Sequence, residues 1–232
     1  DEAGISSPTL FDDVLTVFNI LHKKDTILSI AKDVCDELLK TSNVRTIWRV
    51  GPFTDTVPAH VPIANVTTVT IHGEPTAANS GLFGVTNVPA GPAIFNETIE
   101  IFPGTLDNPT TTELNTDAVA LLIDIEAQGM TPALEPLAEQ VIGRLIGFTI
   151  SHEVVHSLVG FNIPTGHNSP AIPGDMMNNG GDLNFLEATG FNNIVRISPV
   201  DPAHFIDRGI GSIAKLTAVN QAIMDLHFPI TP

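Results

Sequence analysis

The stretch that decides the fold runs from Glu135 to Val159 and reads EPLAEQVIGRLIGFTISHEVVHSLV. Its apolar residues recur at helical spacing, which predicts one long helix. Near the end of the stretch, residues 152–156 read HEVVH, with two histidines four positions apart. Residues at this spacing lie on one face of a helix, so both imidazoles can point at a single ion. The stretch therefore predicts a helix that carries a metal-binding pair of histidines.

The order His-Glu-x-x-His is typical of zinc peptidases. Glu153 follows the first histidine and projects toward the open side of the metal, where it can accept a proton from metal-bound water. Zinc lowers the pKa of that water to about 7 and polarises the scissile carbonyl. We therefore expect a zinc-dependent endopeptidase, with His152 and His156 as zinc ligands. Glu153 would be the catalytic residue that assists the attack of water on the peptide bond.

A catalytic zinc ion takes three protein ligands and keeps one position open. His167 is the first candidate for the third ligand, because a chain that leaves the helix at Gly160 can fold back beneath the metal through residues 161–166. Glu187 is the alternative third ligand, and with it the protein would belong to a different clan of zinc hydrolases than with His167. A non-catalytic extracellular binding module that contains zinc is the third interpretation of the pattern.

Residues 152–178, HEVVHSLVGFNIPTGHNSPAIPGDMMN, resemble the active site of the metzincin clan of zinc peptidases. The likeness is nearest to the matrixin-type and related bacterial branches. The family pattern is HExxHxxGxxH followed by a methionine-containing turn beneath the zinc. The resemblance implies that His152, His156 and His167 are the metal ligands and that Glu153 is the general base.

The methionine turn of the family is similar to Asp175-Met176-Met177, in which Met177 fits the usual Asp-x-Met form. A pair of methionines that fills core space is the other interpretation. His167 follows His156 by eleven residues, where the family has six, so residues 161–166 would bulge outward. The chain contains no tyrosine, and Asn178 stands where some branches place one after the turn.

A second likeness lies in residues 81–86, GLFGVT, which are similar to the family's edge strand. In the family this strand holds an extended substrate by antiparallel pairing. The resemblance implies a protein or peptide substrate held along this strand. The substrate-binding residues would be Leu82, Phe83, Gly84 and Val85.

The order of the predicted elements gives an α+β fold. Helical patterns cover residues 14–20, 26–39 and 212–226, and short β-branched runs at 45–50, 66–72, 82–86 and 98–102 predict strands of one sheet. The resemblance implies one metallopeptidase catalytic domain over residues 1–232. Its upper lobe (about 1–160) would hold a twisted mixed sheet and helices, including the active-site helix. Its irregular lower lobe (about 161–232) would end in a C-terminal helix.

Composition restricts the partners. Ten basic residues stand against 26 acidic ones, which excludes nucleic acid as a partner because its binding needs clustered Lys and Arg. Solubility and bound structural Ca²⁺ are two interpretations of the net charge of −16. No apolar run reaches the roughly 18 residues that cross a bilayer, so we expect no membrane insertion.

Cysteine usage bears on localisation. Cys35 is the single cysteine, so no intramolecular disulfide can form. Bacterial exported proteins commonly lack disulfides, and we expect a secreted or cell-surface protein of bacterial origin. The sequence leaves substrate specificity and oligomeric state open.

Overall fold

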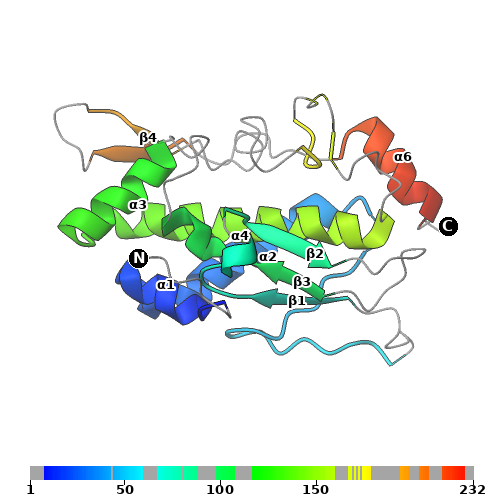
Figure 1. Cartoon of the computed structure of the whole chain (residues 1–232), viewed down its shortest axis with the longest axis horizontal. Coiled ribbons are helices and arrows are strands. Elements are labelled where there is room, and N and C mark those ends of the chain that lie inside the picture. Colours follow the sequence, from blue (N-terminus) through cyan, green and yellow to red (C-terminus); the bar gives the residue numbers. More distant parts are fainter. Residues whose placement is uncertain are drawn as a thin grey trace.

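The computed structural model describes residues 8–42, 44–59, 67–79, 81–87, 98–107, 117–159, 167–168, 170, 172, 174–178, 194–198, 204–208 and 216–227. These residues form an α+β structure, as predicted (Figure 1). The helices are α1 (Phe11–Val17), α2 (Lys24–Leu39), α3 (Asp117–Gln128), α4 (Glu135–Val159) and α6 (Ala218–His227). The strands are β1 (Thr68–Ile71), β2 (Gly84–Asn87), β3 (Thr98–Ile101), β4 (Ile194–Arg196) and β5 (Phe205–Asp207). Short 3₁₀ turns lie at Leu21–Lys23, Ala77–Asn79 and Pro103–Asp107.

The three-stranded sheet is mixed, which agrees with the prediction. Its order is β1-β3-β2, with β1 parallel to β3 and β2 antiparallel to β3. Gly84 of β2 stands opposite Ile101 of β3. Among the described strands β2 therefore lies at an edge of the sheet, and it packs against α4.

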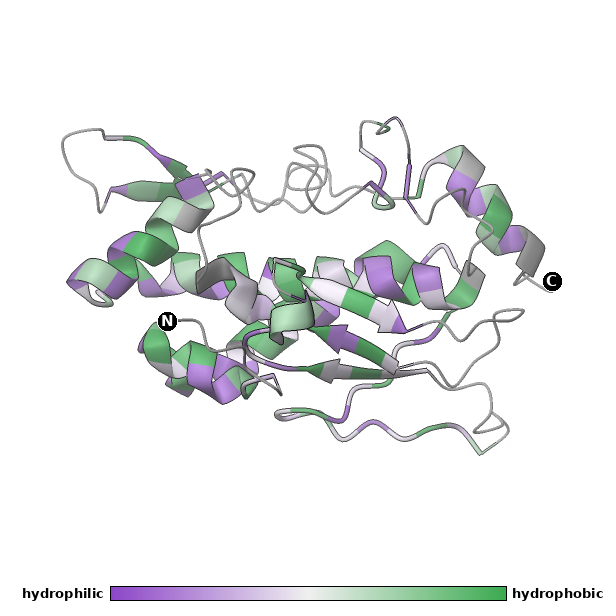
Figure 2. Ribbon diagram, in the orientation of Figure 1, coloured by the Kyte–Doolittle hydropathy of each residue, from purple (hydrophilic) through white to green (hydrophobic). Residues whose placement is uncertain are grey.

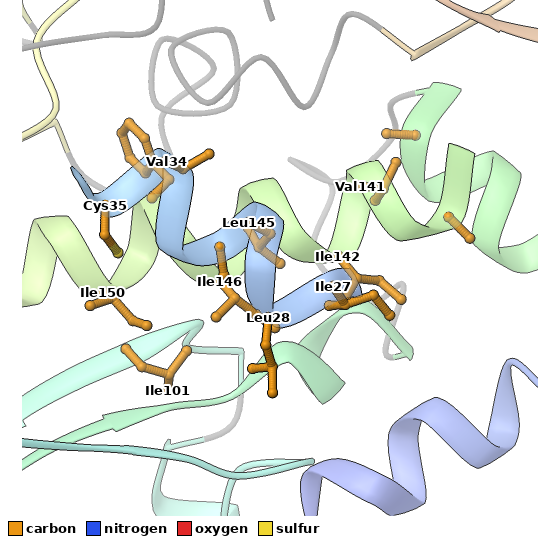
Figure 3. Packing of buried hydrophobic residues seen from close by; sticks show 14 of the residues in the cluster. Ile27, Leu28, Val34, Cys35, Ile101, Val141, Ile142, Leu145, Ile146 and Ile150 are labelled. Atoms are coloured by element: carbon orange, nitrogen blue, oxygen red, sulfur yellow. The ribbon is translucent and has the colours of Figure 1, made fainter. Parts of the chain in front are cut away.

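Helix α4 lies at the centre of the molecule, because its apolar residues cover nearly every side of it. It runs along the long axis in Figure 1 and contacts α2, β2 and β3. Figure 3 shows Ile27 and Leu28 of α2, Ile142 and Ile146 of α4 and Ile101 of β3 within one hydrophobic core. Hydrophilic residues of the C-terminal end of α4 are visible in Figure 2. The core thus surrounds most of α4, and the histidine pair lies near the C-terminal end of this helix.

Glycine on α4 sets how closely α2 can approach. A Cβ at Gly147 would lie 2.4 Å from the carbonyl oxygen of Ala31 and 2.8 Å from Cβ of Val34. A Cβ at Gly143 would likewise lie 2.7 Å from Cβ of Ile30. The two helices therefore pack with their backbones nearly in contact.

Beyond residue 160, β5 and α6 pack on the same central helix, and β4 packs on α3. Strands β4 and β5 form an antiparallel pair, a regular element where the sequence predicted irregular structure. Buried Arg144 of α4 donates to both carboxylate oxygens of Asp207 in β5, at 3.2 and 2.6 Å. This ion pair ties the β4–β5 sheet to the core helix.

One prediction of secondary structure is wrong, and one helix was missed. Residues 45–50 are not a strand, because Trp48 exchanges hydrogen bonds with Asp55 instead: its N–H donates to the side chain and its carbonyl accepts from the Asp55 N–H. The predicted terminal helix is present as α6, which ends one residue beyond the predicted end at Leu226. Helix α3 was not predicted, although Ala118, Leu121 and Leu122 share the helical spacing of its buried face.

No described helix has both the length and the apolar character needed to cross a membrane.

Candidate metal centre

Three histidine side chains meet at the C-terminal end of α4. His152 and His156 come from successive turns of the helix, and His167 comes from the segment that lies beside this end of α4 in Figure 1. The Nε2 atom of His152 lies 3.0 Å from that of His156 and 3.2 Å from that of His167. The third side of the triangle, between His156 and His167, measures 3.3 Å. The structure therefore brings together the three histidines that the sequence singled out.

The spacing of these nitrogens fits a zinc ion. Tetrahedral zinc binds imidazole nitrogens at about 2.0–2.1 Å, which places two such ligands about 3.3–3.4 Å from each other. The observed separations of 3.0–3.3 Å are close to that value. A set of three histidines also leaves one position of a tetrahedral ion open. Among the described residues, these three form a cluster that could hold a metal ion.

The protonation of the histidines suits metal binding. Nδ1 of His152 lies 2.6 Å from the carbonyl oxygen of Met176, so the ring donates through Nδ1 and its Nε2 lone pair faces the other two imidazoles. Burial lowers the pKa of His152 to about 4 and that of His167 to about 4. Burial, with the neighbouring imidazoles, lowers the pKa of His156 to about 2. All three rings are therefore neutral at pH 7, which is the form that binds a metal.

Glu153 lies beside this cluster and is 7% exposed. The hydroxyl of Thr86, on β2, lies 2.7 Å from Oε2 of Glu153 and 3.0 Å from its backbone carbonyl oxygen. Burial raises the pKa of the Glu153 carboxyl to about 7, and the hydrogen bond from Thr86 acts in the opposite direction. A carboxyl group with a pKa near neutrality can both accept and release a proton at physiological pH.

The methionine pair lies next to the cluster and is fully buried. The Met176 carbonyl accepts from His152, and the Met177 carbonyl accepts from the backbone N–H of Asn168, at 2.9 Å. Asp175 closes the turn, since its carboxylate accepts the Met177 N–H at 2.7 Å. The Met176 carbonyl thus holds His152 directly, and the Met177 carbonyl holds Asn168, the neighbour of His167.

Asn178 is completely buried, and its side chain connects Ile172 and Asn168 by hydrogen bonds. Its Oδ1 accepts from the Ile172 N–H and from the side chain of Asn168, and its Nδ2 donates to the Ile172 carbonyl at 2.8 Å. The residue that replaces the tyrosine of the resemblance therefore has a structural role in this chain.

The predicted substrate strand reaches the cluster through Gly84. A Cβ at Gly84 would lie 2.7 Å from Cγ2 of Thr149 and 2.9 Å from Cγ of Glu153, so only glycine lets β2 approach α4 this closely. Gly84 and Val85 are the first two residues of β2, whereas Leu82 and Phe83 lie before the strand begins. Leu82 donates to the Asn79 carbonyl and accepts from the Thr105 hydroxyl, and the Phe83 carbonyl accepts from Phe102. Gly84 is the member of this group that touches Glu153.

The remaining sequence predictions fall outside these contacts. Glu187, Gly160 and residues 161–166 lie outside the described residues. Structural calcium stays a prediction. Thr86 was not singled out from sequence, since no local pattern marks a threonine whose partner is 67 positions away in the chain. Asn178 was noted only as standing in place of a tyrosine, and its hydrogen bonds to Ile172 and Asn168 were not predicted.

No protein-family model, curated protein or solved structure matches this chain.

Proposed function

We propose that the protein is a zinc-dependent endopeptidase of the metzincin type, secreted or displayed on the cell surface. The observation that carries the proposal is the convergence of three neutral imidazole nitrogens within 3.3 Å of one another beside a buried carboxyl group. A structural metal site needs no such base, because its ligands alone fulfil its role.

In this proposal His152, His156 and His167 hold the metal. A bound zinc ion lowers the pKa of water to about 7 and polarises a carbonyl group. Glu153 takes the proton of the attacking water and passes it to the amine that leaves when the peptide bond breaks. Thr86 directs Oε2 of Glu153 by its hydrogen bond and thereby limits the rotation of the carboxyl group.

The substrate would lie along β2. This strand pairs with β3 on one side and is an edge strand among the described residues, so its other side offers backbone groups to an extended peptide. The approach of Gly84 to Glu153 brings such a peptide close to the base. The proposal thus takes a protein or peptide as substrate and Leu82, Phe83, Gly84 and Val85 as its binding residues, of which Gly84 and Val85 lie in β2.

A peptide library tests the proposal. The zinc-loaded protein should cleave it, a chelator should stop cleavage, and added zinc should restore it. His167→Ala should lose both metal and cleavage, whereas His204→Ala, at an exposed histidine, should change neither. Metal binding without cleavage would favour the non-catalytic binding module, and absence of metal binding would contradict the metal centre itself.

A further inference from the structure

Helix α6 is joined to the candidate metal centre by buried polar side chains. Asn220 lies one turn before Met224 on the buried face of α6, and it is 4% exposed. Its side-chain nitrogen lies 3.1 Å from both carboxylate oxygens of Asp175 and 3.1 Å from Oδ1 of Asn168. An amide NH₂ group has two hydrogens, so one can serve Asp175 and the other Asn168. Asn220 of α6 therefore holds both Asn168, next to His167, and Asp175, in the methionine turn.

Both bridged residues act on the histidine cluster. Asn168 is the neighbour of His167, and its backbone N–H donates to the Met177 carbonyl. Asp175 forms the turn whose Met176 carbonyl accepts from His152. The Asp175 carboxylate also accepts the backbone N–H of Thr217, at 2.8 Å, just before α6 begins. The turn is thus fastened to α6 at two points.

The three histidines differ in what fixes them. His152 and His156 belong to a helix that the core holds on all sides. His167 lies eleven residues further on and owes its position to tertiary contacts. A ligand has to be held within about 0.5 Å of its productive position, so these contacts decide how much ordering is left to the metal.

We propose that Asn220 is a positioning residue, through which α6 fixes His167 for metal binding. The proposal rests on the metal site proposed above but not on peptidase activity. It predicts that loss of the Asn220 amide weakens metal binding even though Asn220 does not touch the histidines.

Cobalt(II) is a suitable probe, because its visible spectrum reports the number and geometry of its ligands and its affinity follows from competition with a chelator. Asn220→Leu removes both donors at similar volume, and Asn220→Asp keeps the shape but places a second carboxylate against Asp175. Residues that orient metal ligands typically contribute about 10- to 100-fold in affinity. We expect at least about tenfold weaker cobalt binding and an altered spectrum in both variants.

Gln221→Leu is the matched control. Gln221 lies next to Asn220 on α6, but its amide bonds to Thr41 and Asp225, away from the turn. Its loss can loosen the docking of α6 without touching the bridge. Unchanged cobalt affinity in Gln221→Leu, with weakened affinity in Asn220→Leu, is the expected result. Wild-type affinity and spectrum in a folded Asn220→Leu protein would overturn the proposal.

Asn168→Ala provides a second route if the Asn220 variants fail to fold. Asn168 is only partly buried, and the substitution removes the hydrogen bond between Asn220 and Asn168 from its other end, together with the hydrogen bond from Asn168 to Asn178. It should also weaken cobalt binding. Where Asn168→Ala and Asn220→Leu both fold, the double variant should lose less cobalt affinity than the sum of the two single losses. The reason is that both substitutions remove the same hydrogen bond between Asn220 and Asn168. An Asn168→Ala protein with wild-type affinity would contradict the bridge. A wild-type protein that binds no cobalt would instead contradict the metal centre.

Discussion

The hydroxyl of Thr86 and the carboxylate of Glu153 are joined by a hydrogen bond of 2.7 Å that links the edge strand β2 to helix α4. The two residues are 67 positions apart in the chain. The bond connects the strand that we propose for substrate binding to the residue that we propose as the base. We therefore expect the position of the Glu153 carboxylate to depend on Thr86 of β2.

Substitution of Thr86 tests this connection. Thr86→Val keeps the shape of the side chain and removes the donor, and a hydrogen bond to a charged group contributes about 1.5–3 kcal/mol. We expect kcat to fall about tenfold or more with zinc content unchanged. Thr86→Ser should retain most of the activity, and Thr68→Val, at an exposed position of β1, should retain all of it. Steady-state kinetics with wild-type kcat in Thr86→Val would contradict the role of the bond.

Gly147→Ala should destabilise the protein, against helix propensity. Alanine is favoured over glycine inside a helix by about 1 kcal/mol. At this position, however, the new methyl group would lie 2.4 Å from the Ala31 carbonyl oxygen, and overpacking typically costs about 1–3 kcal/mol. Urea unfolding should show a net loss for Gly147→Ala. Ser29→Ala, on the exposed side of α2, should instead stabilise by about 0.5 kcal/mol. A gain in Gly147→Ala would mean that the helices are not in close contact.

The ion pair between Arg144 and Asp207 should matter more than any surface pair. The Arg144 side chain is 2% exposed and that of Asp207 is 23% exposed, so the pair is only partly buried. Its loss should cost more than the roughly 0–1 kcal/mol of an exposed pair and less than the roughly 3–5 kcal/mol of a fully buried one. Asp207→Asn should therefore lower the free energy of unfolding by about 2 kcal/mol. Lys32→Gln breaks the exposed pair with Asp36 and should cost less than about 1 kcal/mol. Equal effects of the two substitutions would show that Arg144 does not depend on Asp207.

Cys35 should make stability fall at alkaline pH. Its thiol is fully buried and donates to the Gly147 carbonyl, and burial raises its pKa from 9.0 to about 12. Between these values the unfolded chain loses the proton and the native chain keeps it, so stability decreases as pH rises. The stability difference between wild type and Cys35→Ala should shift by about 1.4 kcal/mol from pH 8 to pH 10, to the disadvantage of wild type. Parallel pH profiles of the two proteins would contradict a buried, protonated thiol.

Local patterns made much of this structure predictable. The apolar periodicity of residues 135–159 predicted the bounds of α4, and the helix geometry then placed His152 and His156 together. Helix α3 was predictable from the same kind of pattern. The run 45–50 was misleading because its β-branched residues fit a strand, whereas Asp55 provides the partners that its backbone takes.

Other features of the site depend on tertiary contacts. Thr86 meets Glu153 and Asn220 meets Asp175 only after strands and helices have packed, and neither residue has a neighbour that signals its role. His167 was predicted by its type and its place after the helix, while its distance from the other two imidazoles required the folded turn. Sequence therefore identified the groups with chemistry of their own, and the structure was needed for the groups that orient them.

The most direct test compares the wild type with Glu153→Gln, each loaded with zinc, for metal content and for cleavage of the same peptide library. Glutamine keeps the size of the side chain and cannot take up the proton. The proposed function predicts one zinc per chain in both proteins and a loss of cleavage of about 10²- to 10⁴-fold in Glu153→Gln. Cleavage by Glu153→Gln at the wild-type rate, with zinc bound, would contradict the assignment of Glu153 as the base.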